Sequence, residues 1–267
     1  MSRFGLAGRM LSAWDSASML TPPTAGEPGF DLDEAYAVAD EIRTRRIARG
    51  ERLLGYKIGF TNRGIWERYG VHAPIWGPVW DSTVSQVEGG SATTSLAGLV
   101  QPRLEPEVMF GFSRTPAAGI DKAELVRCLD WVAHGFEIVH THFEGWQFEA
   151  PDTVADFALH GRLFIGERVP IDRFEDPGQE LAALKVTLSK NGREVESGIA
   201  SIVLDGPLDA LHTWLLAMQA QPHGWTVEPG HVVTTGTITD AWPMAPGERW
   251  QTTLSDARLP GLTLRTT

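Results

Sequence analysis

The stretch that decides the fold is QPRLEPEVMF, residues 101–110. Side chains alternate between the two faces of an extended chain, so Glu105 and Glu107 share one face, with their α-carbons roughly 7 Å apart. The residues after Glu107 are apolar, which indicates a strand that runs into a core. Pro106 has no backbone N–H, which suits a strand end or a sheet edge. The sequence therefore predicts two neighbouring carboxylates at the entrance of a buried strand.

A third carboxylate, Glu137, stands in a second apolar segment, residues 136–139. Carboxylates that lie side by side near a core repel one another and are costly to desolvate, so either one takes a proton or a cation lies between them. Three carboxylates with few soft ligands favour Mg²⁺ or Mn²⁺ over zinc and leave coordination positions for water or a chelating substrate. Such residues are also typical of solvated strand ends. Their spacing alone leaves both interpretations open.

The hydrophobic pattern divides the chain into a helical segment, residues 1–52, and a β-rich metal-binding domain, residues 53–267. Helices are predicted at 2–17, 31–49, 121–134, 152–159 and 205–221, with Asp31 and Asp121 as N-caps and Gly135 ending the third. Strands are predicted at 53–60, 108–112, 136–143, 231–238, 249–255 and 261–266, with a hairpin at 183–197 that turns at Asn191-Gly192. Strands in irregular succession with few helices between them indicate an α+β fold.

Composition excludes several classes of protein. The chain has 267 residues, of which 42% are hydrophobic and 21% charged, as in ordinary globular proteins. Its 23 basic and 34 acidic residues give a net charge of −11, which argues against binding to nucleic acid or to an anionic membrane surface. Cys128 is the only cysteine, so a disulfide within the chain and a cysteine-based zinc site are excluded. No membrane-spanning run, signal peptide, glycine-rich phosphate loop, GxSxG or HExxH motif is present, and we expect a cytoplasmic protein.

Six motifs in order resemble one enzyme family. They are GYKIGFT at 55–61, PIWG at 74–77, the 101–110 segment, EIV at 137–139, DTVAD at 152–156 and TTGT at 234–237. Together they resemble the 2-keto-4-pentenoate hydratase and 4-oxalocrotonate decarboxylase family of the fumarylacetoacetate hydrolase superfamily, from about residue 30 to the C-terminus. The resemblance implies a mixed β-roll behind a helical N-terminal segment, a divalent metal and assembly into a homo-oligomer.

The resemblance also implies roles for individual residues. Glu105, Glu107 and Glu137 match the metal ligands of the family. Lys57 matches its active-site lysine, and Asp81 matches the aspartate that partners this lysine. The substrate pocket is matched by Thr235, Gly236 and Thr237.

Two departures from the family pattern concern histidines. His140 stands where relatives usually carry an aspartate, and FALHG at 157–161 replaces an Asn-Ala-Ser-type run. His140 and His142 are predicted to share a strand face with His160 nearby, so an acid–base group could have moved onto imidazole. His160 is therefore a candidate catalytic residue, although a buried histidine is often structural.

The implied activity is that of a hydratase for a small 2-hydroxy-dienoic or 2-oxo acid, of the kind produced by aromatic meta-cleavage. Decarboxylation and C–C bond hydrolysis use the same metal-held enolate, and a non-catalytic partner subunit is a further alternative. Trp76, Trp80 and Trp146 follow or adjoin the matched motifs and could line a pocket for a larger substrate tail, or could serve as core residues.

Overall fold

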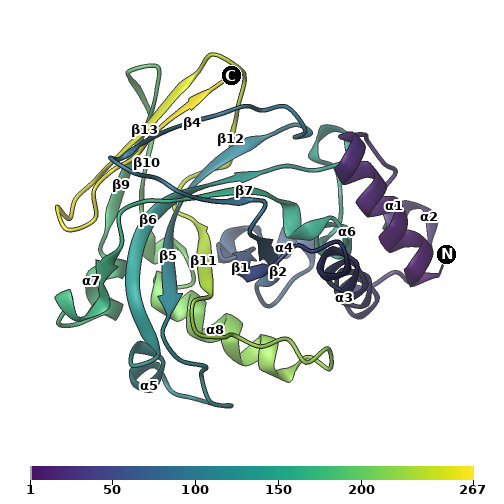
Figure 1. Ribbon diagram of the computed structural model, residues 1–267, viewed down its shortest axis with the longest axis horizontal. Coiled ribbons are helices and arrows are strands. Elements are labelled where there is room, and N and C mark those ends of the chain that lie inside the picture. Colours follow the sequence, from purple (N-terminus) through teal and green to yellow (C-terminus); the bar gives the residue numbers. More distant parts are fainter. Residues whose placement is uncertain (1) are drawn as a thin grey trace.

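The computed structural model describes residues 2–267, so the first residue of the predicted helical segment lies outside the described residues (Figure 1). The helices are α1 (Arg3–Ser16), α2 (Pro23–Gly26), α3 (Leu32–Ala48), α4 (Trp66–Tyr69), α5 (Lys122–Val126), α6 (Ala150–Ala155), α7 (Pro177–Ala182) and α8 (Pro207–Ala220). The strands are β1 (Leu53–Gly59), β2 (Ile75–Trp80), β3 (Val84–Gln86), β4 (Ser91–Thr94), β5 (Arg103–Phe112), β6 (Leu129–Val139), β7 (His160–Ile165), β8 (Val169–Pro170), β9 (Lys185–Lys190), β10 (Arg193–Ile199), β11 (Val232–Thr237), β12 (Trp242–Pro243), β13 (Arg249–Leu254) and β14 (Thr263–Thr266).

Two mixed sheets form the β-rich part of the molecule. The larger sheet has nine strands and runs β2-β1-β11-β5-β6-β7-β3, with β12 paired to β5 and β8 paired to β6. The smaller sheet runs β10-β9-β13-β14-β4. Strands β1 and β11 pair in parallel, whereas β5 pairs antiparallel with both β11 and β6. Figure 1 shows the large sheet curling between the small sheet and helix α8. This arrangement confirms the predicted α+β class with a curled mixed sheet.

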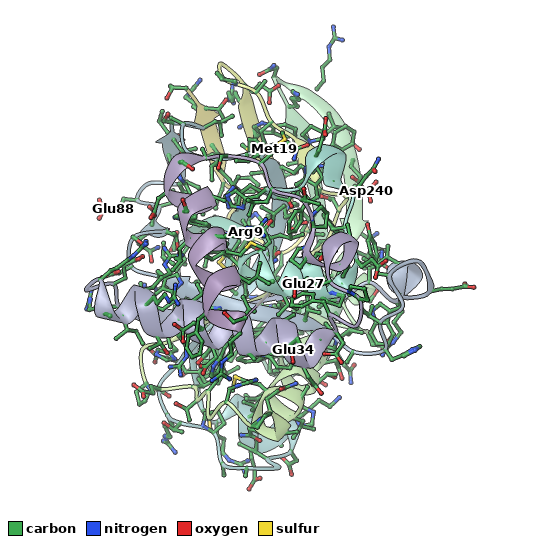
Figure 2. The ribbon with its side chains drawn as sticks, turned by 90° about the vertical axis from the view of Figure 1, so that its right-hand side faces the viewer. Arg9, Met19, Glu27, Glu34, Glu88 and Asp240 are labelled. Carbon is green, nitrogen blue, oxygen red and sulfur yellow. The ribbon has the colours of Figure 1, made fainter. Side chains whose placement is uncertain are left out.

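The N-terminal helices cover one end of the large sheet. Figure 2 faces this side and shows α1 lying across α3. Tyr36 of α3 packs against Trp76 of β2 with ring centroids 4.6 Å apart. Leu6 of α1 and Ile58 of β1 belong to the same buried cluster. Because this core runs across residue 52, the division of the chain into two units stays a prediction.

The predicted helix over 121–134 is wrong beyond its first turns. Asp121 caps α5 as predicted, but the helix ends at Val126 and β6 begins at Leu129. Gly135 lies inside β6, where an added Cβ would come within 2.4 Å of the Phe164 carbonyl oxygen and the Met109 side chain. Pairing with β5 and β7 on both sides therefore outweighs the local helical pattern.

The predicted helix over 152–159 is interrupted for a different reason. Helix α6 ends at Ala155, and a 3-10 turn follows at Phe157–Leu159. These three residues have φ values of +57°, +51° and +63°, in the left-handed region that side chains other than glycine rarely adopt. The turn redirects the chain into β7 and brings the Ala158 carbonyl group toward β1.

Other local predictions are confirmed. Asp31 accepts a hydrogen bond from the Glu34 backbone N–H and caps α3. Asn191 and Gly192 both have positive φ and connect β9 to β10, as a type I′ hairpin requires. In the described chain, no helix combines the length and apolarity needed to cross a bilayer.

Candidate metal centre and active-site cavity

Three glutamates meet where β5 and β6 pair. Glu105 lies directly opposite Glu137 in the register, and Glu107 lies opposite Gly135. One carboxylate oxygen from each of the three lies within 4.8 Å of the others. Glu107 and Glu137 are fully buried, and Glu105 is half-buried. The structure thus brings together the three carboxylates that the sequence singled out.

Only one of the two carboxylate oxygens of Glu107 accepts hydrogen bonds from the described residues. Its Oε2 atom accepts hydrogen bonds from the Gly236 backbone N–H, at 2.8 Å, and from the Thr234 hydroxyl group. Its Oε1 atom is buried and has no hydrogen-bond partner within residues 2–267. A register irregularity in β11 between Thr234 and Thr237 gives Gly236 this orientation. Gly236 has φ of +105°, and a Cβ there would lie 2.0 Å from the Thr61 hydroxyl oxygen.

Glu137 is oriented by a histidine and faces a lysine. His160 Nδ1 lies 2.7 Å from Glu137 Oε1 and donates to it if the carboxylate is ionised. The other ring nitrogen of His160 lies 2.8 Å from the Thr83 hydroxyl oxygen. Lys57 Nζ is 3.3 Å from Glu137 Oε2 and donates to the Ala158 carbonyl oxygen at 3.1 Å. Both ring nitrogens of His160 therefore have hydrogen-bond partners, and the ring holds Glu137 in its orientation.

Burial and mutual repulsion change the ionisation of the cluster. Burial, with the nearby carboxylates, raises the pKa of Glu107 well above its ordinary value and raises that of Glu105 to about 7. Burial alone would lower the pKa of Lys57, but the charges of Glu137, Glu105 and Glu107 raise it. The three carboxylates therefore repel one another, and either protons or a cation must offset this repulsion.

The residues present fit a hard divalent cation. All three donors are carboxylates, which Mg²⁺ and Mn²⁺ prefer. Among the described residues, Glu107 Oε1 has no hydrogen-bond partner, and Glu137 Oε2 has only the ion pair with Lys57. A cation bound between these oxygens would satisfy both atoms and would offset the repulsion.

A cavity of about 430 Å³, here called the inner cavity, opens beside the cluster. Lys57, Glu105, Gly236 and Thr237 line it, together with Arg103. The Arg103 guanidinium stacks over the Trp146 ring, with Cζ 4.1 Å from the ring centroid. Arg103 and Lys57 are the two cationic residues among the lining residues that the structure describes.

The structure does not bring Asp81 to Lys57. Asp81 pairs with Arg52, whose Nε lies 3.0 Å from Oδ2, and not with Lys57. In the register of β1 and β2, Leu53 lies opposite Trp80 and Lys57 opposite Gly77. Four strand residues, or about 13 Å, therefore separate Lys57 from the Asp81 end of the strand pair. The ion-pair partner of Lys57 is Glu137.

Two of the three residues predicted to bind substrate, at 235–237, line the inner cavity, and the third does not. Gly236 and Thr237 line the inner cavity. The Thr235 hydroxyl donates to the Val108 carbonyl oxygen at 2.9 Å and is buried, so its side chain points into the sheet. Thr234, which the sequence interpretation left without a role, holds Glu107 instead.

The other histidines and tryptophans are mostly core residues. His140 and His142 have ring centroids 4.9 Å apart, as their predicted closeness implies, but both are buried beneath Trp14. Trp76 and Trp80 are also buried. Trp146 is the predicted tryptophan that lines the inner cavity.

The chain is 33% identical over 244 residues to the 2-hydroxyhexa-2,4-dienoate hydratase of Comamonas testosteroni, covering 91% of this chain and 89% of that protein. It belongs to the 2-keto-4-pentenoate hydratase and 4-oxalocrotonate decarboxylase family. A 4-oxalocrotonate decarboxylase of Pseudomonas sp is 30% identical over 227 residues, which are 85% of this chain and 84% of that one. No family model matches the chain.

A solved structure has the same fold. It is the 4-oxalocrotonate decarboxylase from Pseudomonas putida G7, complexed with magnesium and adipate, with a TM-score of 0.90 and 25% identity. The comparison covers 99% of this chain and 97% of that chain. The family assignment makes this protein a metal-dependent hydratase or decarboxylase of the meta-cleavage type, since its relatives divide between these two activities.

Proposed function

We propose that this protein is a hydratase that adds water to a small 2-hydroxy-dienoic acid, with Mg²⁺ or Mn²⁺ held by Glu105, Glu107 and Glu137. The observation that carries the proposal is the buried cluster of three carboxylates beside Lys57, with the unpartnered Glu107 Oε1 atom. The hydratase of Comamonas testosteroni supports hydration as the reaction. The decarboxylase complexed with magnesium supports a hard divalent cation.

A bound divalent cation supplies Lewis acidity, which favours enolisation of a 2-oxo acid that chelates it. The protein's residues provide the rest of the chemistry. Lys57 stays charged at neutral pH because its pKa is raised, and its ammonium group stabilises negative charge that develops on the substrate oxygen. The Ala158 carbonyl group and Glu137 fix the position of Nζ.

The reaction balances without any redox partner. A proton moves from the 2-hydroxyl group of the dienoate to C5, the far end of the diene, which gives an α,β-unsaturated 2-oxo acid. Water then adds across the remaining double bond, with hydroxide bonding to the distal carbon and a proton to the carbon beside the ketone. We expect the Lys57 ammonium group to donate a hydrogen bond to the substrate oxygen, because its raised pKa keeps it protonated.

The direct test is incubation of the purified protein with 2-hydroxypenta-2,4-dienoate or 2-hydroxyhexa-2,4-dienoate, with Mg²⁺ and with EDTA. We expect loss of the dienoate absorbance and a product heavier by one water, in the presence of the metal only. Glu107→Gln should abolish the reaction, whereas Glu88→Gln, at an exposed position, serves as the matched control. Turnover that is equally fast in EDTA would contradict the proposal.

Decarboxylation is the second candidate, because the decarboxylase complexed with adipate has the TM-score of 0.90. A 2-oxo-enedioate would then lose one CO₂, and the mass of the product distinguishes this reaction from hydration. C–C hydrolysis would need a base for its water. His140, His142 and His160 are buried, and none of them is among the described lining residues of the inner cavity. A non-catalytic partner subunit would show no metal-dependent turnover with any of these substrates.

We also propose a homo-oligomer in the cytoplasm, as the resemblance and the composition imply. Light scattering coupled to size exclusion measures the subunit number directly. A strictly monomeric protein that is fully active would refute the assembly and leave the site proposal intact.

A further inference from the structure

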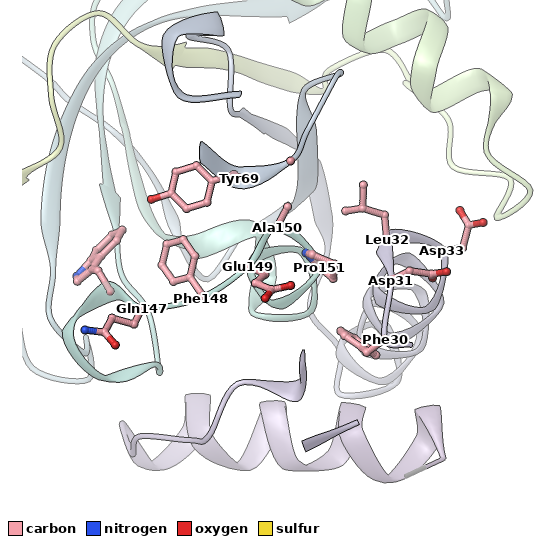
Figure 3. Close-up of a pocket in the computed structure, with 12 residues that line it drawn as sticks. Phe30, Asp31, Leu32, Asp33, Tyr69, Gln147, Phe148, Glu149, Ala150 and Pro151 are labelled. Atoms are coloured by element: carbon pink, nitrogen blue, oxygen red, sulfur yellow. The ribbon is translucent and has the colours of Figure 1, made fainter. Parts of the chain in front are cut away.

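A second hollow adjoins the inner cavity on the side of the N-terminal helices. This outer hollow has a volume of about 860 Å³ and lies between the start of α3, the end of α4 and the segment 146–151 (Figure 3). It is larger than the inner cavity, and none of its described lining residues belongs to the cluster of three glutamates. Its closeness to the inner cavity raises the question of what part of a ligand it could hold.

Three aromatic residues belong to both spaces. Tyr69, Trp146 and Phe148 line the inner cavity and the outer hollow alike. The rings of Tyr69 and Phe148 are stacked with centroids 5.9 Å apart, and the rings of Trp146 and Phe148 are 6.0 Å apart. Figure 3 shows Tyr69 and Phe148 side by side at the edge of the hollow. These three aromatic side chains therefore form a wall that the inner cavity and the outer hollow share.

The remaining lining of the outer hollow is apolar or acidic. Phe30, Leu32, Ala150 and Pro151 contribute apolar surface, and Figure 3 shows Leu32 and Pro151 facing the same space. Among its described lining residues, the ionisable side chains besides Tyr69 are the carboxylates of Asp31, Asp33 and Glu149. The described lining residues include no lysine or arginine. This lining suits an uncharged group and repels an anion.

We propose that the outer hollow binds an uncharged apolar tail of the substrate, whose 2-oxo acid head lies at the glutamates. This inference rests on the proposed function, because the head group must be placed in the inner cavity. We expect a five-carbon acid to lie within the inner cavity, near Lys57 and Glu105. Additional carbon atoms would follow the Tyr69–Phe148 surface into the outer hollow, where their burial increases affinity. A tail that ends in a carboxylate would meet Asp33 and Glu149.

The experiment measures binding of three unreactive 2-oxo acids to the full chain loaded with Mn²⁺, by calorimetry. The acids are 2-oxopentanoate, 2-oxooctanoate and 2-oxooctanedioate, which share the head group and differ in the tail. We expect 2-oxooctanoate to bind at least tenfold more tightly than 2-oxopentanoate. We expect 2-oxooctanedioate to bind at least fivefold more weakly than 2-oxooctanoate.

Variants at Leu32 separate a specific tail site from general hydrophobic attraction. Leu32 lines the outer hollow and not the inner cavity, so Leu32→Trp should remove the preference for 2-oxooctanoate and leave 2-oxopentanoate binding unchanged. Leu32→Arg places a cation in the hollow and should reverse the order of the two eight-carbon acids. Leu216→Trp, at an exposed position of α8 that lines neither space, is the control and should behave as the wild type.

The outcomes distinguish this inference from the proposed function. Binding of 2-oxopentanoate with no gain from a longer tail, or a gain that survives Leu32→Trp, overturns the tail site and leaves the metal site standing. Absence of binding by all three acids overturns the proposed function, and the tail site with it. A gain that is lost in Leu32→Trp and kept in Leu216→Trp supports the tail site.

Discussion

Glu107 and Asp156 are both buried carboxylates, with exposed fractions of 0% and 1%, but their surroundings are opposite. Asp156 accepts hydrogen bonds from the Thr141 hydroxyl at 2.9 Å, from the His142 backbone N–H at 2.9 Å and from His142 Nδ1 at 2.5 Å. Both of its oxygens are satisfied. Glu107 has one oxygen held by β11 and one with no partner, and its nearest charged neighbours include two other carboxylates.

The comparison shows how a carboxylate that stabilises the fold differs from one that can bind a ligand: the first has donors for both oxygens, and the second does not. A buried charge is stable when donors satisfy it, and Asp156 obtains these donors from Thr141 and His142, in the segment that follows β6. Within the described residues, the glutamate cluster combines mutually repelling carboxylates with an unpartnered oxygen, which a proton or a bound cation would offset. Loss of Asp156 should therefore affect folding, whereas loss of Glu107 should affect binding.

The largest effect is expected from Glu107→Gln. Turnover should fall on the order of a thousandfold, because the amide weakens metal binding and the Lewis acid contributes several kcal/mol. The free energy of unfolding of the metal-free protein should stay the same or rise, because a desolvated charge is removed from a repelling group. Calorimetric titration with Mn²⁺ and urea unfolding measure the two quantities. Metal affinity equal to that of Glu88→Gln would contradict the comparison.

Asp156→Ala should give the opposite pattern. Removing this carboxylate leaves the buried His142 ring and Thr141 hydroxyl without their acceptor, which should cost about 3–5 kcal/mol in the free energy of unfolding. Asp130→Ala, at an exposed position of β6, is the control and should cost less than about 0.5 kcal/mol. Urea unfolding of the metal-free proteins provides the measurement. Equal stability of the two variants would show that the Asp156 cluster is not structural.

The histidine beside this cluster predicts a pH dependence of stability. Burial lowers the pKa of His140 to about 3, against about 6.5 in the unfolded chain. Below pH 6.5 the unfolded chain binds more protons at this residue, so its contribution to stability falls as the pH falls. Between pH 7 and pH 4 this residue alone should cost up to about 3 kcal/mol. Unfolding of the wild type and of His140→Asn at both pH values isolates the effect, because all other groups are common to both proteins.

The raised pKa of Glu107 has the opposite effect on the pH dependence of stability. The contribution of His140 must therefore be measured as the difference between the wild type and His140→Asn. A carboxyl group with a raised folded pKa contributes stability that is present at low pH and is lost as the pH rises. A pH profile of the wild type alone would mix the two effects. If the difference between wild type and His140→Asn does not change with pH, His140 is not buried as described.

The smallest effects compare two threonines that donate to the two carboxylates. Thr234→Val removes a donor to Glu107 and should weaken Mn²⁺ binding about tenfold, because outer residues orient metal ligands. Thr141→Val removes a donor to Asp156 and should cost about 1–2 kcal/mol of stability with unchanged Mn²⁺ affinity. The same calorimetric and urea experiments apply. Equal effects of both variants on Mn²⁺ affinity would remove the distinction between the clusters.

The sequence predicted the parts of the site that depend on strand geometry. Glu105 and Glu107 share a face because side chains alternate along a strand. In the register of β5 and β6, Glu105 lies opposite Glu137, so the third carboxylate joins this face once the two strands are neighbours. Gly236 and Thr237 were found through the family resemblance. The α+β class followed from the order of the predicted elements.

Other features depend on contacts that no local pattern contains. The residues up to Gly135 have helical periodicity but form β6, because β5 and β7 pair with them on both sides. The family resemblance implied that Asp81 partners Lys57, but the register of β1 and β2 places Asp81 beside Arg52. The left-handed turn that brings the Ala158 carbonyl to Lys57 contains no glycine to signal it.

The central claim is that one divalent cation binds between Glu105, Glu107 and Glu137. Anomalous diffraction from a crystal of this protein soaked in Mn²⁺ tests it most directly. We expect a single strong peak about 2 Å from one oxygen of each glutamate, with the Glu107 ligand being the atom that faces away from Gly236. A Mn²⁺ peak elsewhere, or none at these glutamates in a crystal of catalytically active protein, would contradict the claim.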